Sequence, residues 1–141
     1  MTEPPGVEPI EDDEILFRRV PASTGWYDPS RMPPLEPEAF RPNRNDLTGI
    51  SLSRQKYKTV EQAAQGRPGK SYYVAAFRAG DIHAAGMHVV PSPTPDDTSH
   101  AEIADLTYDG RKSKQAMECR ALLAERLCLW VKGPFSTHLS E

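Results

Sequence analysis

Polar and apolar positions alternate in several short stretches of the chain, and this period of two is typical of strands with one buried face. Residues 14–20 alternate in this way before Pro21, and in residues 47–54 the side chains of Ile50 and Leu52 share one face. Further strands are expected over residues 72–77, 87–90 and 102–106. The chain is therefore predicted to form a small mixed or mainly antiparallel sheet.

The spacing of apolar residues changes to a helical period after residue 113, at Ala116, Cys119, Leu123, Leu127 and Trp130. This stripe predicts one long C-terminal helix over residues 113–131 that packs across the sheet. Gly133 followed by Pro134 is typical of a helix end. Residues 59–65 predict a shorter helix that starts at Thr59, a residue suited to capping. A sheet covered by one long helix belongs to the α+β class.

Proline is concentrated at the start of the chain, where nine of the fourteen prolines precede residue 43. Because proline removes a backbone donor and fixes φ, this part is expected to be irregular. Residues 1–12 are predicted to be a flexible tail, and residues 13–141 a single α+β domain. A Pro-rich irregular segment over residues 22–42 is expected to be anchored to the domain by its three aromatic side chains.

Charge is distributed unevenly along the chain, although the net charge is only −3. Residues 1–40 carry nine acids and three bases, whereas residues 41–80 carry eight bases and only two acids. The basic middle is either a solvated surface that balances the acidic start or a patch for phosphate, nucleotide or an acidic partner. The acidic balance of the whole chain argues against nucleic acid as the main partner.

No apolar run approaches the roughly 20 residues that span a bilayer, and the acidic start is unlike a secretory signal. A cytoplasmic protein without a membrane partner is therefore predicted. The two cysteines, Cys119 and Cys128, are nine residues apart in the predicted helix, which separates them by about 13.5 Å. That distance is too long for a disulfide, so both are expected to be reduced core thiols.

His100 and Glu102 are the candidate catalytic residues. They lie two positions apart in a predicted strand, so their side chains project from the same face. A carboxylate beside an imidazole favours the charged form, which is one way to tune a histidine for proton transfer. The alternative is structural, with the histidine capping a backbone carbonyl and the carboxylate in solvent.

Six candidate ligand-binding residues lie on the other predicted strands: Arg18, Arg19, Ser51, Ser53, Arg54 and Tyr73. Arg18 and Arg19 point to opposite faces of their strand, so one of them is expected to reach the interior or a cleft. A guanidinium there binds anions in bidentate fashion. Charged protection of an edge strand explains the two arginines equally well.

Three histidines and Glu102 contain enough ligand atoms for a metal ion. His83 and His88, however, are an odd number of positions apart and would face opposite sides of a continuous strand. The sequence therefore predicts no metal site, and no cofactor is predicted either.

Four short motifs are spread along the chain, namely LFRRVP at residues 16–21, GISLS at 49–53, GMHVVP at 86–91 and HAEI at 100–103. Together they resemble a group of small uncharacterised bacterial proteins. That resemblance implies no particular chemistry.

The order of elements also loosely resembles RES-type and other ADP-ribosyltransferase-like domains. These begin with an arginine-bearing strand, followed by a strand with small polar residues and then a helix. The resemblance implies an NAD pocket lined by Arg18, Ser53, Tyr73 and either His100 or Glu102. The tryptophan-containing motif that accompanies the second strand of RES domains is absent from this sequence.

Two functions of different classes follow. The favoured one is a small accessory module that acts through a protein partner, in a defence or toxin–antitoxin locus as the first resemblance implies. The alternative is a small enzyme acting on a nucleotide or NAD-like ligand, with Arg18 or Arg19 on the phosphate and His100 as general acid or base. The enzyme requires residues more than 80 positions apart to meet in one site.

Overall fold

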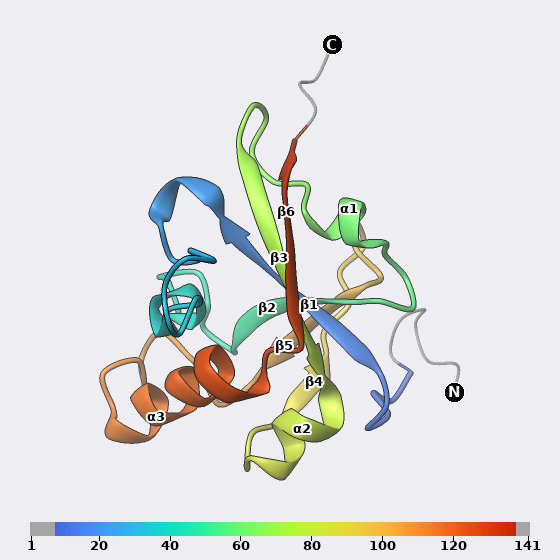
Figure 1. Ribbon diagram of the computed structural model, residues 1–141. Coiled ribbons are helices and arrows are strands. Elements are labelled where there is room, and N and C mark those ends of the chain that lie inside the picture. Colours follow the sequence, from blue (N-terminus) through green and yellow to red (C-terminus); the bar gives the residue numbers. More distant parts are fainter. Residues whose placement is uncertain (1–7, 138–141) are drawn as a thin grey trace.

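A six-stranded antiparallel sheet forms the centre of the protein, as the computed structural model shows for residues 8–137 (Figure 1). The strand order is β4-β5-β2-β1-β3-β6. The strands are β1 Ile15–Pro21, β2 Ile50–Arg54, β3 Ser71–Arg78, β4 Val89–Pro91, β5 His100–Ile103 and β6 Trp130–Ser136. The predicted α+β class is confirmed, and the sheet is antiparallel throughout.

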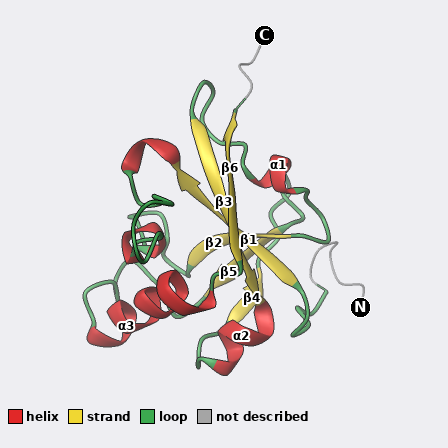
Figure 2. Cartoon of the chain, viewed as in Figure 1, coloured by secondary structure: helices red, strands yellow, loops and turns green. Residues whose placement is uncertain are grey.

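Short helices lie on both sides of this sheet (Figure 2). They are α1 Val60–Ala63, α2 Ala79–Ala84 and α3 Lys114–Leu122, with 3₁₀ turns at Ala22–Thr24 and Pro37–Phe40. At α1, Thr59 Oγ1 accepts from the backbone of Gln62, whose side chain accepts from the backbone of Thr59. This reciprocal cap lets a helix of only four residues start where the sequence predicts it. By contrast, the sequence pattern predicts no helix at the position of α2.

The two faces of the sheet have separate cores. The larger core, which includes Leu16, Phe40 and Phe77, lies against α2 and α3. The smaller core, which includes Phe17 and Val74, lies against α1. Alternation along β1 and β3 assigns successive side chains to these two cores.

β1 is an interior strand, so the alternative that Arg18 and Arg19 protect a sheet edge is wrong. Its pairing is asymmetric. All seven of its residues pair with β3, but only Leu16 and Phe17 pair with β2. β1 and β2 therefore diverge after Phe17, and the backbone between them opens.

The predicted long C-terminal helix is wrong. α3 ends at Leu122 and continues as one π-helical turn, Leu123–Leu127, after which the chain enters β6. Trp130 packs on Phe17 from that strand, with ring centroids 5.8 Å apart. The stretch LWV suits a strand as well as a helix, and pairing with the free edge of β3 decides between them. Gly133 and Pro134 lie inside β6 rather than at a helix end.

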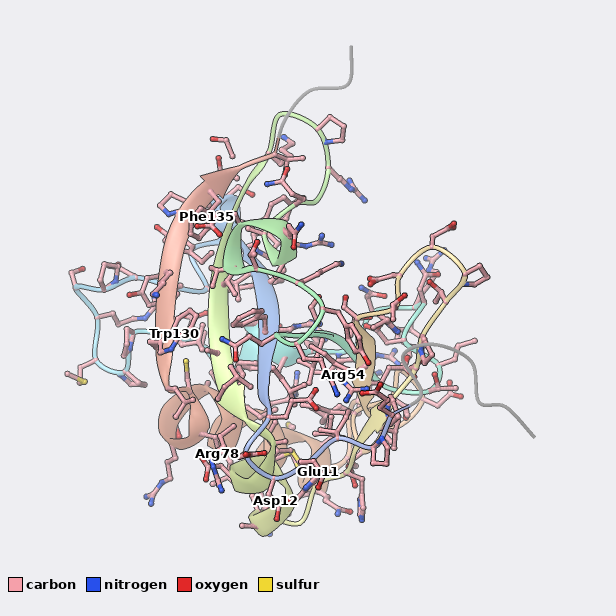
Figure 3. All side chains as sticks on the ribbon, turned by 90° about the vertical axis from the view of Figure 1, so that its right-hand side faces the viewer. Glu11, Asp12, Arg54, Arg78, Trp130 and Phe135 are labelled. Atoms are coloured by element: carbon pink, nitrogen blue, oxygen red, sulfur yellow. The ribbon has the colours of Figure 1, made fainter. Side chains whose placement is uncertain are left out.

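The described part of the N-terminal segment packs on the sheet beside Arg54. Figure 3 shows Arg54 on the far side of β3 and β1 from Trp130 and Phe135 of β6. Arg54 is fully buried, pairs with Glu14 at 2.6 Å and also donates to the carbonyl oxygens of Glu8 and Pro9. Of the predicted tail, residues 1–7 lie outside the described residues.

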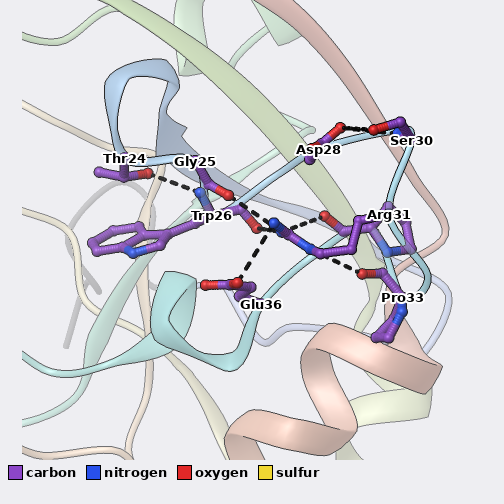
Figure 4. Close-up of polar contacts among 9 residues, drawn as sticks. Thr24, Gly25, Trp26, Asp28, Ser30, Arg31, Pro33 and Glu36 are labelled. Atoms are coloured by element: carbon purple, nitrogen blue, oxygen red, sulfur yellow. Dashed lines mark hydrogen bonds and ion pairs between the residues drawn. The ribbon is translucent and has the colours of Figure 1, made fainter.

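Arg31 holds the irregular segment after β1 in place (Figure 4). Its Nη2 atom donates to the carbonyl oxygens of Gly25, Trp26 and Pro34, and its Nη1 atom lies 3.5 Å from Glu36. One side chain thus joins both ends of the loop and fixes the backbone that carries Trp26. No helix in residues 8–137 is long and apolar enough to cross a membrane.

Candidate functional site

A cleft of about 1240 Å³ opens beside the point where β1 and β2 diverge, and we call it the β1–β2 cleft. Its walls come from β1, β2, the starts of β3 and β5, and the loops that follow β1, α1 and β5. This volume exceeds the roughly 300–1,000 Å³ of most small-ligand pockets. The cleft is therefore large enough for a ligand of dinucleotide size.

The β1–β2 cleft is strongly basic although the chain is acidic overall. Eight arginine or lysine residues line it: Arg18, Arg19, Arg41, Arg44, Lys58, Arg67, Lys70 and Arg111. Only two acids do, Asp46 and Asp97, and Asp97 is already paired with Lys58 at 3.0 Å. A concave surface with this excess of cations attracts anionic ligands and concentrates them.

Arg18 is fixed at the base of the cleft by neutral groups. Its Nε donates to the carbonyl oxygen of Ala39 at 3.0 Å, and its Nη1 to that of Ser51 at 2.9 Å. Burial lowers the pKa of Arg18 to about 10, with Asp46 acting in the opposite direction and Arg19 adding to the decrease. The guanidinium is therefore charged at neutral pH, oriented, and held without a carboxylate partner within residues 8–137.

Arg19 projects from the other face of β1 and is exposed. It donates to the carbonyl oxygen of Gln65 and lies 4.9 Å from the centre of the Tyr72 ring. The Tyr72 hydroxyl accepts from the backbone of Arg67 at 2.9 Å. At Gly66 a Cβ atom would lie 2.4 Å from the Tyr72 ring, so only glycine allows this loop to approach the tyrosine. The loop brings Arg67 to the cleft.

Ser51, Ser53 and His100 lie on one face of β2 and β5. Ser53 is directly opposite His100 in the register, and Ser51 is the diagonal neighbour. The His100 Nε2 atom is 3.0 Å from Ser51 Oγ, and its Nδ1 atom is 2.8 Å from the carbonyl oxygen of Ser92. All three residues line the cleft. Ser51 and His100, which are 49 positions apart in the sequence, therefore meet in the cleft.

The remaining predicted site residues lie elsewhere. Glu102 shares the face of His100, as predicted, but it accepts from Thr48 Oγ1 at 2.9 and 3.0 Å and does not line the cleft. Arg54 is buried in its ion pair with Glu14. Tyr73 packs edge-on against Tyr27, at 4.8 Å between ring centroids, and it is the neighbouring Tyr72 that lines the cleft.

Several cleft residues were not singled out from the sequence, among them Trp26, Arg41, Arg44, Arg67, Lys70 and Arg111. The basic middle of the chain was the signal for four of these cations, since Arg41, Arg44, Arg67 and Lys70 all belong to it. Arg111 lies 3.8 Å from the centre of the Tyr108 ring and comes from a loop that carries no such signal.

Neither cysteine is a candidate nucleophile. Cys119 and Cys128 are both free, and burial raises the pKa of each thiol, that of Cys128 to about 11. Both are therefore protonated at neutral pH, and a thiol reacts much more slowly than a thiolate. Within the described part of the chain, no three histidine, cysteine or acidic side chains gather closely enough to hold a metal ion.

Comparisons of this chain with protein-family models, with curated proteins and with solved structures gave no match. Any function must therefore be argued from the geometry of the β1–β2 cleft.

Proposed function

We propose that this protein binds a nucleotide or an NAD-like dinucleotide in the β1–β2 cleft and acts on it as a small enzyme. The observation that carries the proposal is Arg18. Its charge is desolvated and oriented by two carbonyl groups, and no carboxylate among the described residues is hydrogen-bonded to it. The cleft around it is lined by seven further cations and only two acids. A phosphate group supplies the missing negative charge and accepts from the planar guanidinium.

The lining of the cleft also favours a nucleotide over a simple inorganic anion. Trp26, which is half-buried, contributes aromatic surface beside the cations. Stacking of a base on an aromatic ring and contact of cations with phosphate are the usual components of nucleotide binding. The size of the cleft suits two linked phosphates with at least one base.

The proposal is tested by thermal unfolding of the full chain with ADP, NAD and inorganic pyrophosphate. A ligand that binds only the folded state adds about 2.7 kcal/mol at 100 times its Kd. In Arg18→Met we expect affinity for the stabilising ligand to fall about 10- to 100-fold, because a hydrogen bond to a charged group contributes about 1.5–3 kcal/mol.

The matched control is Arg78→Met. Arg78 is a half-exposed arginine that pairs with Asp81 at 3.2 Å and does not line the cleft. Equal loss of affinity in both variants, or no stabilisation by any of the three ligands, contradicts the proposal. Quenching of Trp26 fluorescence gives a second readout, which Trp26→Phe is expected to remove and Trp130→Phe to leave.

A protein partner remains a prediction from the sequence. β1 lies between β2 and β3 in the sheet, so removal of residues 1–42 would destroy the fold rather than isolate a partner site. Capture of a partner by the full chain, followed by competition with ADP, is the informative test. Release by ADP would mean that the partner occupies the basic cleft.

A further inference from the structure

Ser51 and His100 form a hydrogen-bonded pair inside the β1–β2 cleft. Ser51 Oγ lies 3.0 Å from His100 Nε2, and the other ring nitrogen lies 2.8 Å from the carbonyl oxygen of Ser92. A serine within hydrogen-bond reach of a histidine that a third group orients is the general arrangement of an activated nucleophile.

The direction of the hydrogen bonds follows from the partner at Nδ1. A carbonyl oxygen only accepts, so His100 Nδ1 carries the proton in the bond to Ser92. In a neutral imidazole Nε2 is then the acceptor, and Ser51 donates its hydroxyl proton to it. This is the tautomer that takes a proton from serine during attack.

The surroundings of Ser51 suit a reaction with an anionic substrate. Ser51 is exposed to the cleft, and Arg18 Nη1 donates at 2.9 Å to the carbonyl oxygen of the same residue. The Arg18 guanidinium is therefore fixed on the backbone of the residue that carries the hydroxyl group. Fixed cations next to a reacting group stabilise negative charge that develops on the substrate.

We propose that Ser51 is a nucleophile, with His100 as its general base, and that it accepts the phosphoryl group of a phosphate ester. Ser51 Oγ forms a bond to phosphorus while the bond from phosphorus to the ester oxygen breaks. The serine proton passes to His100 Nε2 and then to the departing ester oxygen. Water attacks the phosphoserine next, giving its proton through Nε2 to Ser51 Oγ as phosphate leaves.

The chain contains internal comparisons for this pair. Ser53 lies on the same face of β2 and directly opposite His100, yet the imidazole bonds to Ser51. His88 also has an oriented ring, with Nδ1 3.0 Å from Asp105 Oδ2, but its side chain is 75% exposed and outside the cleft. If the pair is reactive, a reagent for nucleophilic serines should modify Ser51 and not Ser53, and the rate should depend on His100 and not on His88.

The test is covalent labelling of the full chain with an uncharged alkyl fluorophosphonate, followed by mass spectrometry of the labelled peptide. We expect the adduct on Ser51 and not on Ser53. In His100→Asn the amide reproduces the donor to the Ser92 carbonyl but removes Nε2, so the labelling rate should fall about 100-fold or more. His88→Asn should label at the wild-type rate, and Ser51→Ala should not label at that position.

An adduct on another residue, no adduct on the folded wild-type chain, or equal rates in wild type and His100→Asn would overturn the assignment. Thermal unfolding of each variant shows that loss of labelling is not loss of fold. Release of 4-nitrophenol from 4-nitrophenyl phosphate that disappears in Ser51→Ala supports the phosphate ester as substrate. Labelling of Ser51 without release of 4-nitrophenol overturns the assignment of a phosphate ester as substrate.

The substrate class rests on the proposed nucleotide function, whereas the nucleophile does not. The fluorophosphonate carries no charge and needs no cation for binding. Labelling of Ser51 without stabilisation by ADP, NAD or pyrophosphate would contradict the proposed function and keep the serine assignment. Stabilisation by one of these ligands without labelling of Ser51 would support the proposed function and contradict the serine assignment.

Discussion

Arg54, the last residue of β2, and Arg18, in the neighbouring strand β1, are both desolvated, but the regions around them compensate their charges differently. Arg54 meets both carboxylate oxygens of Glu14, at 2.6 and 2.8 Å, and this bond raises its pKa. Arg18 meets only carbonyl oxygens, and burial lowers its pKa to about 10. The first region is electrostatically complete, while the second leaves a positive charge that a ligand can neutralise.

The difference follows from the pairing of the strands. β1 and β2 pair at Leu16 and Arg54, where the chain before β1 folds back and supplies Glu14. Beyond Phe17 the strands separate, and among the described residues that line the gap only Asp46 and Asp97 are acidic. The part of β1 that pairs with β2 thus carries a structural ion pair, and the part that does not pair with β2 lines the proposed anion site.

The largest expected effect comes from breaking the complete pair. Glu14→Gln leaves the Arg54 guanidinium buried without its carboxylate, so we expect the free energy of unfolding to fall by about 3–5 kcal/mol. Urea denaturation measures the change. Ligand binding in the β1–β2 cleft should be retained in the folded fraction.

Glu11→Gln is the matched control, because Glu11 is exposed on the same segment (Figure 3) and should change stability by less than about 0.5 kcal/mol. A double variant, Glu14→Leu with Arg54→Met, should recover most of the loss, since apolar replacement of a buried ion pair is often neutral. If the double variant is less stable than Glu14→Gln, the effect is not one of uncompensated charge.

Arg31 is an intermediate case. It donates to several carbonyl oxygens, and its carboxylate partner, Glu36, is half exposed at 3.5 Å. We expect Arg31→Ala to lower the free energy of unfolding by about 1–2 kcal/mol through lost hydrogen bonds. Hydrogen exchange should increase in residues 25–36. Arg126→Ala, at an exposed arginine of the C-terminal helix, should change neither quantity; equal effects of the two variants would contradict this assignment.

The strands were predictable because their burial follows a local pattern. Apolar and polar residues alternate around Ile50 and Leu52, and this alternation predicts which side of β2 is buried. The C-terminal segment was not predictable in this way, since the spacing from Leu123 to Trp130 fits a helical stripe. Its last residues become β6 because the edge of β3 is free to pair, which is a tertiary effect.

The site was predictable in part for a similar reason. Arg18, Ser51 and His100 stand out individually as polar residues on apolar strands. That His100 bonds to Ser51 and not to Ser53 depends on the β2–β5 register and the position of the Ser92 carbonyl. The choice between Tyr72 and Tyr73 depends on which face of β3 meets the cleft. Both the register of the strands and the face of β3 that meets the cleft are tertiary features, which a local sequence pattern does not predict.

Arg18→Met is the counterpart of Glu14→Gln. Glu14→Gln should lower stability and leave ligand binding intact, whereas Arg18→Met should leave stability nearly unchanged and weaken binding. The variant loses two hydrogen bonds to carbonyl groups but also removes a desolvated charge that lacks a carboxylate. We expect the free energy of unfolding to change by less than about 1 kcal/mol while anion affinity falls. A loss of several kcal/mol in urea denaturation would place Arg18 with Arg54 as a structural residue.

Substitution of Arg120 should give the smallest change in stability. It tests directly whether the partner of a buried arginine determines what that arginine contributes to stability. It is 7% exposed; its Nε and Nη1 atoms have no hydrogen-bond partner among the described residues, and Glu38 is 3.7 Å away. Its ion pair with the half-exposed Glu38 is long and should stabilise the protein little, and Arg120 does not line the cleft. Arg120→Met should therefore be neutral or stabilise the protein by about 1 kcal/mol in urea denaturation. A decrease in the free energy of unfolding as large as that of Glu14→Gln would contradict this expectation. It would mean that packing of the aliphatic part of the side chain, and not the partner of its charge, determines how a buried arginine affects stability here.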